Sequence, residues 1–339
     1  MRSFSPSTGA VRFLAAISSR LRETILSRAL SMAWFVSVAA MGEWASAADE
    51  AAVPATADGA TEGVPFVPLL TLFIAVVLAV IAHRRRWLVL EGRPGLGWLT
   101  SPMHLMLMCV ATWLAGGVAT LAAARALGLD GTIDPAALSV RQMAIVTASS
   151  MGAGMLTAVG LIIWLRRIQL APRATNSPAR SIAFGVAMLV AWWPAIASAG
   201  WVAGQVQLMS TGIEPPAIGH TTLEHMVHGA RDVWWWLMGL SAIVLAPILE
   251  ECIYRGFVQQ ALRRAGLGPW AAVLLASVVF TLMHVGSVPA EARAASLTSL
   301  AVLSCCFGWV AERTGSLAAP IAAHVAFNLA NLVIASAFA

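Results

Sequence analysis

Long runs of apolar residues, separated by short polar segments, dominate the chain from residue 65 onward. Eight of these runs are long enough to cross a bilayer, which takes about 20 residues, with a lower limit near 17. They are residues 65–83, 102–124, 141–165, 181–203, 233–262, 270–286, 295–311 and 317–338. Because a bilayer offers no water to bond exposed backbone groups, we expect each run to be a helix. The pattern predicts an all-α, polytopic transmembrane helix bundle of about eight spans.

Composition supports a membrane protein over a soluble one. The chain is 59% hydrophobic and 11% charged, with a mean hydropathy of +0.79, whereas soluble domains carry roughly a quarter charged residues. Its net charge of +5 comes from arginines in short clusters between apolar runs, an arrangement that sets membrane orientation. We therefore expect the bilayer as a partner and no nucleic acid.

The arginine clusters also predict which loops face the cytoplasm. One set of loops contains Arg84, Arg85, Arg86, Arg93, Arg166, Arg167, Arg173, Arg180, Arg263, Arg264 and Arg313. The opposite loops contain Arg125, Arg141, Arg231 and Arg293. Cytoplasmic loops carry the excess of basic residues, so the first set is predicted to be cytoplasmic and the C-terminus to lie outside.

The first 63 residues have a different character. Residues 1–47 combine scattered arginines, a short apolar stretch at 29–41 and a small-residue cleavage site at 45–47, which predicts a signal peptide or an N-terminal anchor. Residues 48–63, rich in Ala, Asp, Glu, Thr and Pro, predict a disordered extracytoplasmic lead. A cleavable signal favours the bacterial cytoplasmic membrane as the location.

Few polar side chains fall deep within the apolar runs, and they are grouped. They are Glu250, Glu251, Arg255, His284, His324 and Asn328. A charge at mid-bilayer costs at least about 2.5–3.5 kcal/mol and commonly marks function. Glu251 and Arg255 are four residues apart, so they share a helix face and can pair. At about 1.5 Å per residue, all three helices bring their polar groups to a similar depth, roughly 16–22 Å from the arginine-rich loops.

These residue types suit hydrolysis of an amide. A buried carboxylate such as Glu250, beside a histidine such as His284, can deprotonate a water molecule. His324 and Asn328 can donate hydrogen bonds to a developing oxyanion. Alternatively, Glu250, His284 and His324 can hold a divalent metal such as zinc, which then activates the water. A third interpretation is a buried polar network that only fixes helix packing.

The same residues resemble three motifs of the CAAX protease and bacteriocin-processing family (CPBP, Abi-like). Residues 250–255 match its EExxxR motif, Phe280 to His284 its FxxxH motif, and His324 to Asn328 its HxxxN motif. The resemblance implies an intramembrane endopeptidase with a CAAX-protease-like core. It assigns the base to Glu250, water positioning to His284, and the oxyanion site to His324 and Asn328. Glu251, Arg255 and Phe280 are then supporting residues.

The resemblance also divides the chain and defines its partners. We assign residues 64–232 to accessory transmembrane helices and an outer loop, and residues 233–338 to the catalytic transmembrane domain. A peptide or protein is the expected substrate. Bacterial members are described as metalloproteases, so a zinc requirement stays open.

Two further alternatives come from the outer loop and from function itself. Glu224, His225 and His228 could share a helical face and hold a metal, although their spacing differs from that of zinc-protease helices. An amphipathic helix, able to cover the mouth of the site, is the simpler interpretation. The alternative function is a non-catalytic membrane protein that binds a partner or confers immunity.

Pro247 lies three residues before Glu250 and predicts a distortion of the span at residues 233–262.

Overall fold

The computed structural model describes residues 66–92, 95–129, 138–170, 177–216 and 219–337. Regular structure within these residues is helical, and eight spans are long and apolar enough to cross a membrane. They are α2 (Phe66–Arg84), α3 (Pro102–Ala126), α4 (Val140–Arg167), α5 (Pro178–Thr211), α7–α9 (Val233–Arg264), Pro269–Ser287 with α10 (Pro269–Met283), Ala290–Thr314 with α11 (Arg293–Thr314), and α12 (Ala318–Ala337). The predicted all-α, polytopic fold is confirmed. The predicted signal or anchor at 1–47 and the lead at 48–63 lie outside the described residues.

Serine caps start three of the spans. The hydroxyls of Ser101, Ser139 and Ser177 accept hydrogen bonds from backbone N–H groups of the first turns of α3, α4 and α5. Such caps satisfy donors that have no partner inside the helix. Pro102 and Pro178 occupy the first helical position, where a missing N–H costs nothing. Local sequence therefore fixes where these spans begin.

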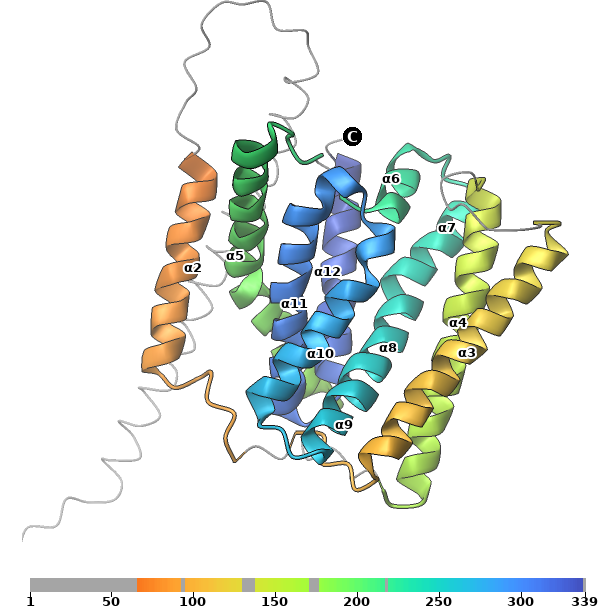
Figure 1. The fold of residues 1–339 in the computed structure, drawn as a ribbon, viewed down its shortest axis with the longest axis horizontal. Coiled ribbons are helices and arrows are strands. Elements are labelled where there is room, and N and C mark those ends of the chain that lie inside the picture. Colours follow the sequence, from red (N-terminus) through yellow and green to blue (C-terminus); the bar gives the residue numbers. More distant parts are fainter. Residues whose placement is uncertain (1–65, 93–94, 130–137, 171–176, 217–218, 338–339) are drawn as a thin grey trace, which may run out of the picture.

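The helices form a bundle in which the C-terminal spans occupy the centre (Figure 1). α2 lies at one edge and α3 with α4 at the other, while α8, α10, α11 and α12 lie between them. α5 packs against α2, α11 and α12. α5 approaches α12 so closely at Gly185 that a side chain at this position would collide with the backbone of Ala319. Small residues commonly permit such contacts between membrane helices.

A short helix, α6 (Thr221–His228), lies outside the spans, at the end of the bundle that also holds the C-terminus (Figure 1). Met226 of α6 is buried, and its carbonyl accepts a hydrogen bond of 2.7 Å from the indole N–H of Trp235 at the start of α7. The amphipathic helix expected in the outer loop is therefore present.

The fifth span is a composite of α- and π-helical turns. α7 (Val233–Leu240), α8 (Ala246–Glu251) and α9 (Gln259–Arg264) are joined by π-helical segments at Ser241–Leu245 and Cys252–Val258. Such turns inside α-helices occur frequently at functional sites. The first ends at Leu245, two residues before Pro247, so the distortion predicted from this proline takes the form of a wider helical turn.

Candidate active site

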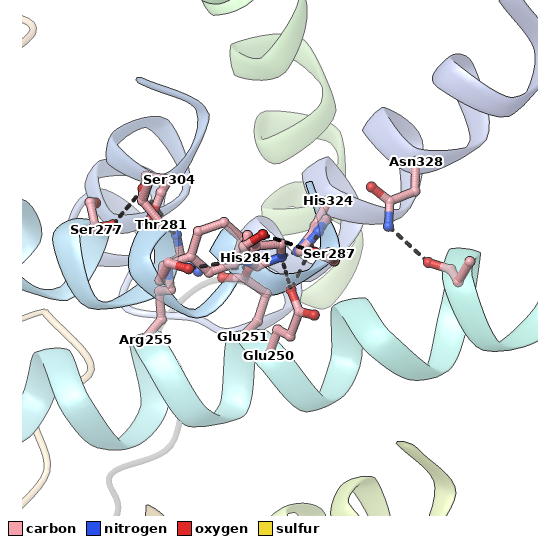
Figure 2. A network of polar contacts seen from close by, with 12 residues as sticks. Glu250, Glu251, Arg255, Ser277, Thr281, His284, Ser287, Ser304, His324 and Asn328 are labelled. Atoms are coloured by element: carbon pink, nitrogen blue, oxygen red, sulfur yellow. Dashed lines mark hydrogen bonds and ion pairs between the residues drawn. The ribbon is translucent and has the colours of Figure 1, made fainter. Parts of the chain in front are cut away.

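Three helical spans bring the predicted glutamates, Arg255 and the two histidines together, whereas Asn328 lies to one side of this cluster (Figure 2). Glu250 and Glu251 end α8, His284 caps the C-terminus of α10, and His324 lies on α12. Residues separated by more than 70 positions in the sequence thus meet in one cluster.

Glu251 occupies the buried side of the cluster. Its Oε1 atom accepts hydrogen bonds of 2.9 Å from Arg255 Nη1 and of 2.9 Å from His324 Nδ1. Glu251 is fully buried and Arg255 is 1% exposed. The pairing of Glu251 with Arg255 that the spacing predicted is present. The bond to His324 was not predicted, and it ties α8 to α12.

Arg255 links this cluster to α11, a helix for which the sequence predicted no site residue. Its Nη2 donates to the carbonyl and to the hydroxyl of Ser304, at 2.9 and 2.7 Å. Its guanidinium lies over the rings of Phe280 and Phe307, 5.0 and 5.3 Å from their centroids. Cation–π contacts and charged hydrogen bonds strengthen in a dry interior. The only sequence signal for Ser304 was a hydroxyl within an apolar span.

Glu250 faces the other way, toward two imidazoles. Its Oε2 atom is 3.9 Å from His284 Nε2 and 3.8 Å from His324 Nε2, distances too long for direct hydrogen bonds. The Nδ1 atom of His284 lies 2.8 Å from the carbonyl of Phe280. Because a carbonyl only accepts, that Nδ1 carries a proton, and the bond to the Glu251 carboxylate places one on His324 Nδ1 in the same way. In their neutral forms, both histidines therefore turn an Nε2 lone pair toward Glu250.

Asn328 completes the distorted span. In this π-helical turn, the Ala246 N–H donates to the carbonyl of Ser241, five residues earlier. By the same spacing, the carbonyl of Ala242 would accept a hydrogen bond from the N–H of residue 247. Pro247 has no N–H to offer. Asn328 Nδ2 donates to that carbonyl instead, at 2.8 Å (Figure 2). This bond uses one of its two amide protons and leaves the second for other partners.

A cavity of about 1190 Å³ opens beside these groups. Its lining includes Glu250, His284, His324 and Asn328, whereas Glu251 and Arg255 are not part of it. Its walls come from both edges of the bundle, including α3 and α4, and from the segment around α6. The adjoining glutamates thus separate into one that faces a cavity and one that does not.

The predicted zinc ligands Glu250, His284 and His324 have some features of a metal site and lack others. Both Nε2 atoms face Glu250, and both Nδ1 atoms are held by acceptors, as is usual for metal-bound histidines. Across the described ranges, however, no group of three or more His, Cys, Asp and Glu side chains has the arrangement of a metal site. This applies to Glu250 with the two histidines and to Glu224 with His225. The zinc alternative stays a prediction.

Comparison with known proteins places the site within a family. Residues 232–330 match the family model of the type II CAAX prenyl endopeptidase Rce1-like proteins. No curated protein and no solved structure gave a significant match to the chain. The matched range contains every residue of the cluster described above, and it begins just before α7. The resemblance to the CAAX protease family is therefore confirmed over residues 232–330, the part of this membrane protein that matches the Rce1-like, type II CAAX prenyl endopeptidase model.

Proposed function

We propose that the chain is an endopeptidase that hydrolyses a peptide bond within or beside the membrane, with Glu250 as the general base. The observation that carries this proposal is the position of the Glu250 carboxylate. It lies within 4 Å of the Nε2 atoms of two histidines, at the wall of a cavity large enough for a peptide segment. Cavities with a few converging polar groups are typical active sites.

In this scheme, a water molecule bound between Glu250 and His284 attacks the substrate carbonyl. Its proton passes to Glu250, and the new C–O bond gives a tetrahedral intermediate. The Glu250 carboxyl group then returns the proton to the departing amine as the C–N bond breaks. General acid–base help of this kind contributes about 100- to 10,000-fold in rate.

The oxyanion needs hydrogen-bond donors, and two side chains can supply them. Asn328 has a second amide proton beyond the one given to Ala242. His324 can donate from Nε2 only when doubly protonated, in which form its Nδ1–H still holds Glu251. Each such donor typically contributes about 100- to 1,000-fold. The substrate class that follows is a polypeptide that reaches this cavity.

The test is proteolysis of a quenched peptide library by the purified protein in detergent. Wild type should cleave, and Glu250→Gln, which keeps the side-chain shape, should not. Glu291→Gln, at an exposed position, is the matched control and should retain activity. Equal cleavage by wild type and Glu250→Gln would contradict the proposal and favour a non-catalytic, partner-binding function. Loss of wild-type activity in a chelator, restored by zinc, would favour the metal scheme over the Glu–His scheme.

A further inference from the structure

The cavity occupies one half of the bundle only. Its described lining runs from Glu250 and Phe280 toward the end of the bundle that holds α6 and the C-terminus. At that end it includes Trp201 of α5, Ser296 of α11 and Asn331 of α12. The loops at the opposite end contribute none of its described lining residues. A substrate therefore has its shortest path to Glu250 from the α6 end.

The arginines of the described chain are concentrated at the opposite end. The loops and helix ends there hold Arg84, Arg85, Arg86, Arg166, Arg167, Arg180, Arg263, Arg264 and Arg313. The α6 end holds Arg125, Arg141, Arg231 and Arg293. Because cytoplasmic loops carry the excess of basic residues, the α6 end faces away from the cytoplasm.

We infer that the cavity receives its substrate from the extracytoplasmic side, so that the substrate class is an exported or membrane-anchored polypeptide. The substrate class rests on the proposed function, whereas the side of access does not. A cytosolic protein would have to cross the arginine-rich end and half of the bundle to reach Glu250.

Thiol labelling in intact cells tests the side of access without any need for cleavage. Three single substitutions are compared with the parent chain, whose four native cysteines lie within the spans and provide the background. Ser287→Cys places a thiol in the cavity, Ser210→Cys an exposed one at the α6 end, and Ala265→Cys an exposed one at the arginine-rich end. A membrane-impermeant maleimide should label positions 210 and 287 in intact cells, and position 265 only after lysis. Labelling of 265 but not 287 in intact cells, or no labelling of 287 in either state, would overturn the inference.

A second, independent observation concerns His220, which begins α6. Its Nδ1 accepts a 3.2 Å hydrogen bond from the backbone N–H of Thr222, so it caps the helix. Since Nδ1 is the acceptor, the proton of the neutral ring lies on Nε2. The bond to Thr222 uses Nδ1 and leaves the Nε2–H group for other partners. His220 lines the same cavity as Glu250 and His284.

The surroundings of His220 keep its ring uncharged and in place. Burial, and to a lesser degree the proximity of His284, lower the pKa of His220 to about 4. The preceding residue, Gly219, packs so closely on α11 that a side chain there would collide with Ser296. The Nε2–H group of His220 is therefore a fixed, neutral hydrogen-bond donor at the wall of the cavity.

The geometry points to His220 as a substrate-binding residue that donates a hydrogen bond from Nε2 to a carbonyl of the bound peptide. It would act beside the proposed base, not as a base itself. This inference rests on the proposed function, and its test uses the same peptide cleavage.

The test separates the donor from the helix cap. Asparagine is a good N-cap, so His220→Asn keeps the cap and the unfolding temperature but removes the Nε2 donor. We expect kcat/KM to fall about 3- to 10-fold, the range for one neutral hydrogen bond, mainly through KM and equally from pH 5.5 to 8. His220→Gln, whose longer side chain restores a donor, should recover part of this loss.

Three results would contradict the donor role of His220, and each has a different meaning. Wild-type kinetics in His220→Asn, with a loss confined to His220→Ala, would show that only the cap matters. Equal activity of the Asn and Gln variants would also contradict the donor role. A wild-type protein without Glu250-dependent cleavage would remove the proposed function and this inference together, whereas the labelling result would stand.

Discussion

Glu250 and Glu251 are adjacent in the sequence, yet they face two different regions of the molecule. Glu251 is fully buried, with Arg255 and His324 both bound to one of its oxygens. Glu250 is 19% exposed and faces a cavity, with two imidazole nitrogens just beyond hydrogen-bond distance. One carboxylate has its partners within the protein, and the other is open to a reactant. The comparison separates a region that holds helices together from a region that can do chemistry.

The largest expected effect tests the cavity side. Glu250→Gln should lower the rate of peptide cleavage about 100- to 10,000-fold, because the amide cannot accept the proton of the attacking water. The thermal unfolding temperature in detergent should stay near that of wild type, since Glu250 makes no short hydrogen bond within the described residues. A large loss of stability instead would show that Glu250, like Glu251, holds the helices together, and would contradict the distinction between the two glutamates.

The next effect tests the buried side. Arg255→Ala should destabilise the protein by about 3–5 kcal/mol, because it leaves Glu251 charged and buried without its cation. Denaturation in detergent, followed by tryptophan fluorescence, measures this. The double variant Glu251→Gln with Arg255→Met should recover most of the loss, since no charge is then stranded. An Arg255→Ala protein as stable as wild type would contradict the assigned role of the pair.

Asn328 lies between the two regions, and it should affect both. Asn328→Leu removes a proposed oxyanion donor, so the cleavage rate should fall about 100- to 1,000-fold. It also leaves the carbonyl of Ala242 without a partner, which costs about 1–3 kcal/mol. Asn331→Leu is the matched control, because Asn331 lines the same cavity but donates to Phe327 of its own helix. Equal kinetic losses in both variants would indicate a general change in the cavity.

The smallest effect sharpens the boundary of the buried region. Ser304→Ala removes one hydrogen bond to the charged Arg255 and should cost about 1.5–3 kcal/mol in stability. The backbone carbonyl of Ser304 still accepts from Arg255, so the fold and the cleavage rate should persist. Thr120→Val, which removes a neutral bond within α3, is the comparison and should cost less. A Ser304→Ala variant that loses activity at full stability would extend the chemical region to α11.

Apolar run length and i, i+4 spacing predicted the spans and the pairing of Glu251 with Arg255. Both patterns are local, because one helix turn brings such residues onto the same face. The division of the chain into accessory and catalytic parts at residue 233 stays a prediction, although the family match begins at residue 232. The proposed catalytic roles of Glu250, His284, His324 and Asn328 likewise await their tests.

The hydrogen bonds between residues of different helices could not be predicted from the sequence. It showed that His324 and Asn328 share a face, but not that His324 binds Glu251 or that Asn328 bonds the carbonyl of Ala242. It also gave no reason to assign Ser304 or His220 to the site. Such contacts depend on how each helix is rotated about its axis and how deeply it sits beside its neighbours. The sequence by itself determined the membrane helices and the chemical groups they carry. Tertiary packing decided which glutamate faces the cavity, because that choice depends on side chains from α10, α11 and α12 acting together.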